Sequence, residues 1–454
     1  MIEKIFTHTQ ALCPICRAKT HGRIIERNDQ IFLQKFCPQH GRTEALISSD
    51  ASWYQESRAY VKPGQRPLTF SVDTFKGCPD SCGLCPEHMQ HTCLPVVEVT
   101  TACDMQCPIC LKASQHPSHM SMEAFDYVLE QLFRCEGKVH VINLSGGEPT
   151  LHPRFDMLLK LAKERGVMQT SVSTNGARLQ NDPQLRDLFR ESGTIASIQF
   201  DGFDAGAYRF MRGQDLLQKK LQTIELLEKE GITYTLVATI VKDVNDDQIT
   251  DITNFFFESE ALSLMFQPAA FTGRAEALFT PHHRVTIPDV VHEIEKSCYV
   301  SPGDFNPLPC AHFSCFALSY YFHVEGQRYL SMKEFLGLED YLSVISNRTL
   351  PGLDYQGYTK IREKIYDIWS AADSNASDKQ VLRRMQEILR EMNSAAFSPR
   401  KAFSLGTTSM KSIFIHQFMD AETLDFGRLI KCCNHYAQQD GRLMPMCSAN
   451  IFYQ

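Results

Sequence analysis

Short β-branched segments alternate with amphipathic helical segments from residue 96 to about residue 270. This alternation is typical of a parallel sheet wound by βα units. The helical segments, such as HPRFDMLLKLAKERG, have apolar residues at spacings of three and four and end in a glycine, as surface helices do. The pattern predicts an α/β fold with a partial, TIM-like (βα)6 barrel. Its strands are expected at residues 96–101, 139–145, 169–174, 196–200, 234–241 and 264–269.

The regions on either side of this pattern differ from it in composition. The first 95 residues are rich in turns and cysteines, and the part after about residue 285 combines the segment GDFNPLPC with a charged helical stretch, TKIREKIYDIWS. A chain of 454 residues usually forms more than one domain. We expect an N-terminal metal-binding region at 1–95, the barrel at 96–285 and a C-terminal auxiliary-cluster domain at 286–454.

Charge and hydropathy restrict the partners and the location of the chain. The formal net charge is -7, and no run of lysine or arginine occurs, so nucleic acid is not an expected partner. No apolar segment reaches the length of about 18 residues that a membrane span needs, and the N-terminus MIEKIFTHTQ lacks the features of a signal peptide. We expect a cytoplasmic protein without a transmembrane segment. In that compartment the 17 cysteines stay reduced, so clustered ones indicate metal ligands.

Three cysteines follow the first predicted strand directly, in EVTTACDMQCPIC. They are Cys103, Cys107 and Cys110, with three and then two residues between them. Three thiolates leave one iron of a 4Fe-4S cluster free to bind another molecule. Enzymes with a βα barrel have their active sites at the carboxyl ends of the barrel strands. A structural metal site is the alternative, although zinc sites usually pair cysteines two by two.

This spacing resembles that of the radical SAM superfamily, whose cluster binds S-adenosylmethionine (SAM), and other strand ends are similar to its motifs. GGEP, at residues 146–149, would receive the SAM amino group, and polar residues after the third and fourth strands would bind its carboxylate and ribose. Tight turns and loop caps are the alternative explanation for such residues. Ile109 departs from the family, which usually has an aromatic residue there. The resemblance implies cofactor-binding roles for Gly146, Gly147, Glu148, Pro149, Ser173, Asn175, Asp201, Gln267 and Arg274.

Further cysteines indicate additional metal sites. Cys13 and Cys16 with Cys37 and His40 form a C-x2-C and C-x2-H pair, which suits one mononuclear iron or zinc; His40 could instead be a turn residue. Cys78, Cys82, Cys85 and Cys93 supply four thiolates for an auxiliary 4Fe-4S cluster, with zinc as the alternative. The remaining candidates could together form another cluster, with one of two adjacent cysteines spare; they are Cys310, Cys315, Cys432, Cys433 and Cys447.

The order of these motifs along nearly the whole chain resembles the tetraether lipid synthase and methanopterin methylase group of radical SAM proteins. Members carry two auxiliary clusters and a rubredoxin-like iron beside the SAM cluster. The resemblance implies an enzyme in which a 5'-deoxyadenosyl radical abstracts hydrogen from an unactivated carbon. C-C bond formation or alkylation of a lipid or small-molecule substrate would follow, with an electron donor such as flavodoxin or ferredoxin. Peripheral membrane contact stays open.

Two other functions compete with this interpretation. In the first, the same radical leads to oxidation or rearrangement of a small molecule, and the auxiliary clusters accept an electron. In the second, the chain is a non-catalytic iron-sulfur electron carrier. The electron-carrier hypothesis does not explain the GGEP and STNG motifs at the strand ends.

Overall fold

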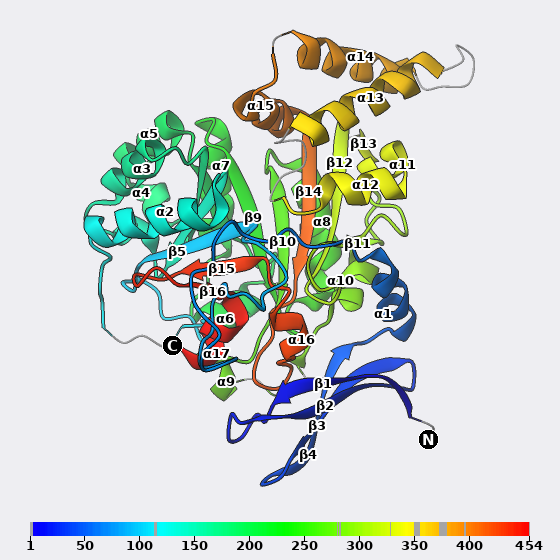
Figure 1. The fold of residues 1–454 in the computed structure, drawn as a ribbon. Coiled ribbons are helices and arrows are strands. Elements are labelled where there is room, and N and C mark those ends of the chain that lie inside the picture. Colours follow the sequence, from blue (N-terminus) through cyan, green and yellow to red (C-terminus); the bar gives the residue numbers. More distant parts are fainter. Residues whose placement is uncertain are drawn as a thin grey trace.

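The computed structural model describes residues 3–112, 116–278, 280, 283–326, 328–348, 355–371, 379–394 and 396–453. Two sheets organise the chain (Figure 1). The smaller, at the N-terminus, is an antiparallel meander of four strands in sequence order. Its strands are β1 (Lys4–Leu12), β2 (Lys19–Arg27), β3 (Gln30–Cys37) and β4 (Gly41–Ser48).

The larger sheet contains the predicted barrel, and the expected α/β fold is confirmed. Six consecutive strands lie side by side and parallel, in the order of the sequence. Each lies within a few residues of its predicted position. They are β5 (Leu94–Thr100), β6 (Val141–Gly146), β7 (Gln169–Thr174), β8 (Ile195–Gln199), β9 (Tyr234–Ile240) and β10 (Ser263–Pro268).

Helices cover the outer face of these strands, and α2 shows why the sequence folds this way. The Ser121 hydroxyl caps its first turn by accepting from the Ala124 N–H, and Phe125 and Leu132 are buried against the sheet. Gly137, at a φ of 71°, ends the helix where a side chain would be strained. The helices of this layer are α2 (Met122–Glu136), α3 (Phe155–Glu164), α4 (Ala177–Asn181), α5 (Pro183–Ser192), α6 (Ala205–Arg212), α7 (Leu217–Lys229) and α8 (Ile249–Glu258).

The region after residue 285 does not keep to a sheet of its own. Strand β14 runs parallel to β10 at one edge of the barrel, and β15 runs parallel to β5 at the other. The C-terminal segment therefore extends both edges of the barrel sheet, which the alternation pattern did not predict. The added strands are β11 (Asn306–Pro307), β12 (Phe316–Glu325), β13 (Arg328–Ser331), β14 (Met410–His416), β15 (Asn434–Ala437) and β16 (Leu443–Pro445).

The helices outside the barrel layer lie in several places. In Figure 1, α13 and α14 project at the top of the view, beyond the end of β14. No helix in the described ranges is long and apolar enough to cross a membrane. These helices are α1 (Ala51–Ser57), α9 (Ala275–Leu278), α10 (Ile287–Ile294), α11 (Met332–Leu336), α12 (Leu338–Ile345), α13 (Tyr355–Ala371), α14 (Lys379–Asn393), α15 (Pro399–Ser409), α16 (Phe426–Leu429) and α17 (Met446–Phe452).

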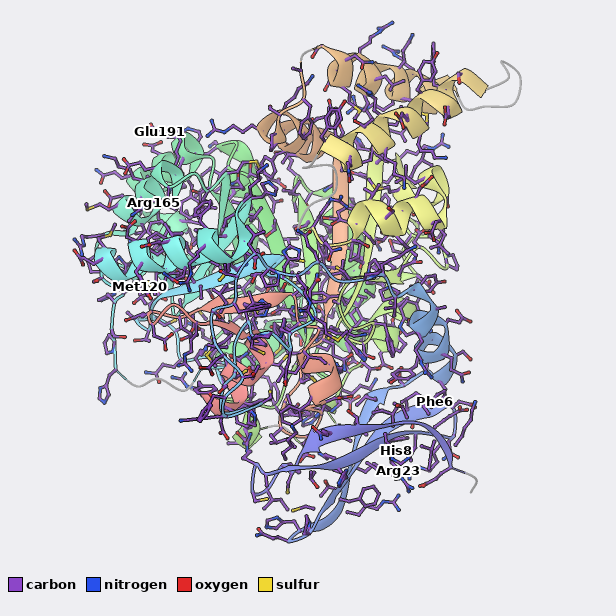
Figure 2. The ribbon with its side chains drawn as sticks, in the orientation of Figure 1. Phe6, His8, Arg23, Met120, Arg165 and Glu191 are labelled. Carbon is purple, nitrogen blue, oxygen red and sulfur yellow. The ribbon has the colours of Figure 1, made fainter. Side chains whose placement is uncertain are left out.

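Aromatic and charged contacts attach the N-terminal sheet to the rest of the molecule. Phe6 of this sheet, labelled in Figure 2, packs edge-on against Tyr54, which packs in turn against Phe313, with ring centroids 5.9 and 5.0 Å apart. The fully buried Lys35 donates to the Glu422 carbonyl at 2.5 Å and to its carboxylate at 3.1 Å. The Lys35 ammonium is buried while its partner Glu422 is partly exposed, and these contacts join the N-terminal sheet to the C-terminal segment.

Candidate active site

A cavity of about 720 Å³ lies inside the barrel. It is lined by residues from β5 to β10 and from the C-terminal strands β12, β14 and β15. All three cysteines of the predicted triplet line it, and so do most of the predicted cofactor-binding residues. These residues are Cys103, Cys107, Cys110, Gly146, Gly147, Glu148, Ser173, Asn175, Gln267 and Arg274.

Two glycines hold the triplet loop against the end of β6. A Cβ on Gly146 would lie 2.0 Å from the Thr100 carbonyl oxygen, and one on Gly147 would lie 2.2 Å from that of Ala102. The Gly147 N–H donates to the Thr100 carbonyl at 2.8 Å. Only glycine allows this approach of two backbone segments, so the GG of GGEP positions the loop that carries the cysteines.

Glu148 is a fixed carboxylate in the cavity wall. Its side chain is buried and accepts hydrogen bonds from the Thr150 hydroxyl at 2.7 Å, the Thr174 hydroxyl at 2.8 Å and the Asn175 N–H at 2.8 Å. Burial raises the pKa of Glu148, and the hydrogen bonds oppose that rise. This arrangement fixes the orientation of the carboxylate beside the triplet.

Asp201 does not have the position expected for a ribose ligand. Among the described residues, Arg212 lines the cavity at this point and Asp201 does not. The fully buried Asp201 carboxylate accepts from Arg212 Nε at 2.8 Å and Nη2 at 2.9 Å, and from the Thr239 N–H at 3.0 Å. These bonds turn the Asp201 carboxylate toward Arg212 and Thr239, away from the cavity lining. Its observed role is to orient Arg212, whose guanidinium also contacts the Cys107 thiol.

The sequence reasoning missed two cationic residues, Arg212 and Lys220. Arg212 lies at the end of α6, eleven residues after Asp201. Its closeness to Asp201 in the sequence was the one signal that could have identified it. Lys220 of α7 is buried, with its amine donating to the Asn175 carbonyl at 2.6 Å and to the Gln199 amide oxygen at 3.2 Å. Burial lowers the pKa of Lys220 to about 8. Nothing in the amphipathic sequence of α7 distinguished Lys220 from a solvent-exposed lysine.

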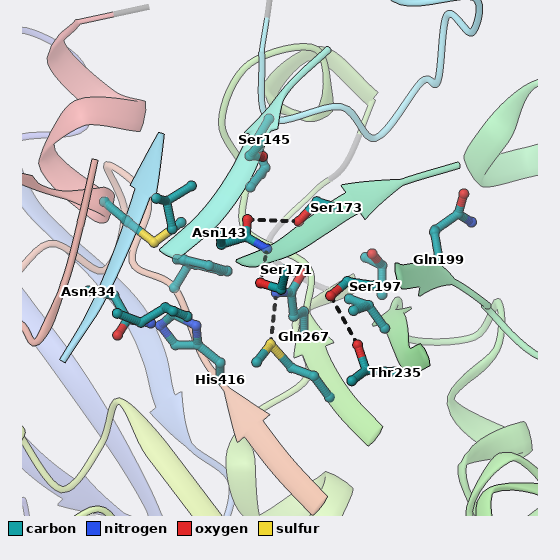
Figure 3. Close-up of a pocket in the computed structure, with 18 of the residues that line it drawn as sticks. Asn143, Ser145, Ser171, Ser173, Ser197, Gln199, Thr235, Gln267, His416 and Asn434 are labelled. Atoms are coloured by element: carbon teal, nitrogen blue, oxygen red, sulfur yellow. Dashed lines mark hydrogen bonds between the residues drawn. The ribbon is translucent and has the colours of Figure 1, made fainter. Parts of the chain in front are cut away.

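Other predicted residues of the cavity bond to their neighbours. The Ser173 hydroxyl donates to the Asn143 side chain at 3.0 Å, and the Asn143 amide donates to the Ser171 hydroxyl at 2.8 Å (Figure 3). The Arg274 N–H donates to the Cys110 carbonyl at 3.0 Å, so its backbone supports the triplet loop. Pro149 begins a short 3-10 turn and is absent from the cavity lining of the described chain.

The N-terminal sheet brings together the predicted mononuclear site. The ligand atoms of Cys13, Cys16, Cys37 and His40 all lie within 4.8 Å of one another. His40 Nδ1 is 3.6 Å from the Cys13 sulfur and 3.5 Å from the Cys37 sulfur. Three thiols and one imidazole at these separations suit a tetrahedral metal ion.

The remaining cysteines are grouped differently from the expectation. Cys78, Cys82 and Cys85 lie together around a small pocket, but Cys93 does not complete their set. Its thiol interacts with those of Cys310 and Cys433. The Cys93 N–H also donates to the Cys433 carbonyl at 2.8 Å. The loop after residue 85 therefore carries Cys93 to a second group of thiols.

The adjacent cysteines of the C-terminal segment lie in different surroundings. Cys433 faces Cys93 and Cys310, whereas the Cys432 thiol interacts electrostatically with Cys315 and Cys447 and with Cys82. Polar N–H groups point at these sulfurs, with Arg428 Nη2 at 3.5 Å from Cys315 and the Met419 N–H at 3.3 Å from Cys447. The expectation that one of Cys432 and Cys433 is spare stays a prediction.

Comparisons with known proteins agree with this geometry. A family model described as the radical SAM superfamily matches residues 97–256, and one described as the HMPTM N-terminal zinc ribbon domain matches residues 5–49. The chain is 28% identical over 480 residues to 7,8-dihydro-6-hydroxymethylpterin dimethyltransferase of Methanocaldococcus jannaschii, covering 98% of this chain and 94% of that protein. It is also 28% identical over 195 residues to GTP 3',8-cyclase of Cronobacter sakazakii, covering 41% and 58% respectively.

Solved structures resemble part of the fold. Streptococcus suis SuiB bound to its precursor peptide SuiA matches at a TM-score of 0.39 and 16% identity, covering 46% of each chain. TYW1 with a lysine-pyruvate adduct matches at a TM-score of 0.32 and 17% identity, covering 46% of this chain and 72% of that one. Similarity at this level carries no argument about function. The family model and the sequence relatives show that residues 97–256 form a radical SAM domain and that the chain is a radical SAM enzyme.

Proposed function

We propose that the chain alkylates a carbon atom of a small, pterin-like heterocycle in a SAM-dependent radical reaction. The observation that carries this proposal is the alignment with the pterin dimethyltransferase of Methanocaldococcus jannaschii over 98% of this chain. That alignment extends through the zinc-ribbon region and the C-terminal cysteines as well as the barrel. A relative that shared only the radical SAM domain would not support a substrate class.

The residues of the cavity fit a 4Fe-4S cluster with SAM. Cys103, Cys107 and Cys110 offer three thiols from one loop for the iron; burial raises the pKa of Cys107, and the Arg212 guanidinium opposes that rise. When bound, the cluster and SAM supply a 5'-deoxyadenosyl radical that can abstract hydrogen from carbon. Gly146 and Gly147 hold the triplet loop, Glu148 presents a fixed carboxylate for the SAM amino group, and the barrel wall excludes water.

We further propose that the other cysteines hold two auxiliary clusters. One would use Cys93, Cys310 and Cys433, and the other would use Cys78, Cys82 and Cys85 with Cys432 facing Cys82. Cys315 and Cys447 lie beside Cys432 and offer further ligands. Cys13, Cys16, Cys37 and His40 would hold one iron or zinc ion. A protein such as flavodoxin or ferredoxin would supply the electron for SAM cleavage.

The cavity combines polar and apolar side chains, and its volume supports a small-molecule substrate. Asn143, Ser171, Ser173, Ser197 and Thr235 place amide and hydroxyl groups along the barrel interior (Figure 3). The described cavity volume of about 720 Å³ is within the usual range of small-molecule sites, about 300–1,000 Å³.

The test is a product analysis. Anaerobically reconstituted, reduced protein is incubated with SAM and 7,8-dihydro-6-hydroxymethylpterin, and the pterin fraction is analysed by mass spectrometry. We expect 5'-deoxyadenosine and a pterin carrying one or more additional methyl groups. For each methyl group added we expect two SAM molecules and two electrons from the reductant to be consumed: one SAM gives 5'-deoxyadenosine and methionine, and the other donates the methyl group and leaves as S-adenosylhomocysteine. Release of 5'-deoxyadenosine with an unchanged pterin, under conditions in which that pterin binds, would refute alkylation of this substrate.

A further inference from the structure

His416 is a polar residue at the end of β14 that no step above uses. It is 6% exposed and lines the cavity. Its ring lies between those of Phe316 and Phe418, with centroid distances of 3.9 and 4.0 Å. Phe316 is also its neighbour across the β12 and β14 pair. This stacking fixes the plane of the imidazole and leaves its edge available for polar contacts.

The ring nitrogens of His416 differ from those of the other buried histidines. His88, His152 and His435 each have a hydrogen-bond partner. In the described part of the chain, neither ring nitrogen of His416 has one. Burial, helped by the charge of Arg428, lowers the pKa of His416 to about 3. The ring is therefore neutral near pH 7 and offers one donor and one acceptor to a molecule in the cavity.

On the opposite side of the cavity, polar side chains already bond to one another. Figure 3 shows His416 on the other side of the view from Ser197 and Thr235, whose hydroxyls bond to each other at 3.0 Å. The charged residues Glu98 and Lys112 are paired at 3.0 Å. His416 is thus a neutral polar group of the lining that lacks a protein partner among the described residues, and it lies in an aromatic wall suited to a flat molecule.

We propose that His416 positions the substrate by hydrogen bonding to the lactam edge, the adjacent N–H and C=O groups, of a neutral planar heterocycle. This inference deepens the proposed function and rests on it. A lactam edge offers a C=O that can accept from the protonated ring nitrogen and an N–H that can donate to the unprotonated one, and because the two ring nitrogens point in diverging directions, His416 makes one of these bonds at a time. The flat ring of such a substrate would lie against the wall that contains Phe316 and Phe418. His416 is a positioning residue in this scheme, because it carries no part of the hydrogen abstraction.

The experiment compares substitutions that separate the polar edge of the ring from its volume. His416→Phe keeps an aromatic ring between two others and removes both nitrogens, whereas His416→Gln restores one donor and one acceptor. The matched control is His323→Phe, a histidine of the adjacent strand β12 that lies outside the cavity lining. Iron content and the near-ultraviolet circular dichroism spectrum report whether each variant is folded.

Binding is measured with the reconstituted protein and SAM, by fluorescence titration of 7,8-dihydro-6-hydroxymethylpterin, lumazine and guanine. We expect the wild type to bind at least one of these lactams, His416→Phe to bind it about tenfold more weakly, His416→Gln to recover part of the loss, and His323→Phe to match the wild type. The inference is overturned if the wild type binds none of the three or if folded His416→Phe binds them equally well. The product analysis tests the proposed function separately. If His416→Phe binds more weakly but the wild type alkylates no pterin, the positioning role of His416 is kept and the proposed alkylation reaction is rejected.

Discussion

The Asp201 and Arg212 pair gives a quantitative test of how the cavity is held together. The Asp201 side chain is 0% exposed and that of Arg212 is 11% exposed, and two hydrogen bonds of 2.8 and 2.9 Å join them. Asp201→Asn keeps the volume but removes the negative charge, so a buried guanidinium loses its counter-ion. Breaking a buried pair in this way costs about 3–5 kcal/mol. We expect a loss in the free energy of unfolding near the lower value, because Arg212 retains some solvent contact.

The assay is urea unfolding of the metal-free protein, followed by circular dichroism. The control is Asp246→Asn, whose i,i+4 pair with Lys242 at 2.7 Å has side chains 19% and 47% exposed. Such a surface pair contributes about 0–1 kcal/mol. SAM cleavage should fall in Asp201→Asn as well, because the misplaced Arg212 no longer supports Cys107. If Asp201→Asn loses no more stability than Asp246→Asn, the carboxylate is not what holds Arg212, and the reasoning fails.

Three further predictions concern the metal sites and the triplet loop. Cys107→Ala should abolish 5'-deoxyadenosine release while auxiliary iron remains, as counted by iron and sulfide analysis; retained release would contradict the triplet assignment. Gly146→Ala should also lose SAM cleavage, because its Cβ would lie 2.0 Å from the Thr100 carbonyl oxygen at a φ of 126°, and an active variant would show that the loop can move away. His40→Ala should lose one metal equivalent by elemental analysis after dialysis against a mild chelator, and an unchanged metal content would remove His40 from the ligand set.

The barrel could be predicted from the alternation of strand and helix patterns, because each βα unit consists of consecutive residues. The strand ends beside Cys103, Gly146 and Ser173 could also be placed together, since the carboxyl ends of parallel strands share one edge of a sheet. The pairing of β15 with β5 joins segments more than 330 residues apart. The hydrophobic periodicity of a strand does not indicate which distant strand will pair with it.

The grouping of Cys93 with Cys310 and Cys433 escaped prediction for the same reason. Spacing suggested a set with its sequence neighbours, and only the path of the loop showed otherwise. Asp201 was correctly seen as a polar strand end, but its identity could not reveal that Arg212 would occupy its oxygens. A carboxylate looks the same in sequence whether it faces a ligand or a neighbouring cation.

The addition of β14 and β15 to opposite edges of the barrel has a consequence for the order of events during synthesis. The ribosome produces the triplet and all six barrel strands before it produces these two, and domains fold as their residues emerge. Until then the walls that carry Phe414 and His416 on one side and Asn434 and Tyr436 on the other are missing from the cavity. A nascent chain could present its cluster-binding cysteines early, yet it would have no enclosed chamber in which a radical is shielded from solvent. The cavity therefore gains its last walls only when the C-terminal strands have been made.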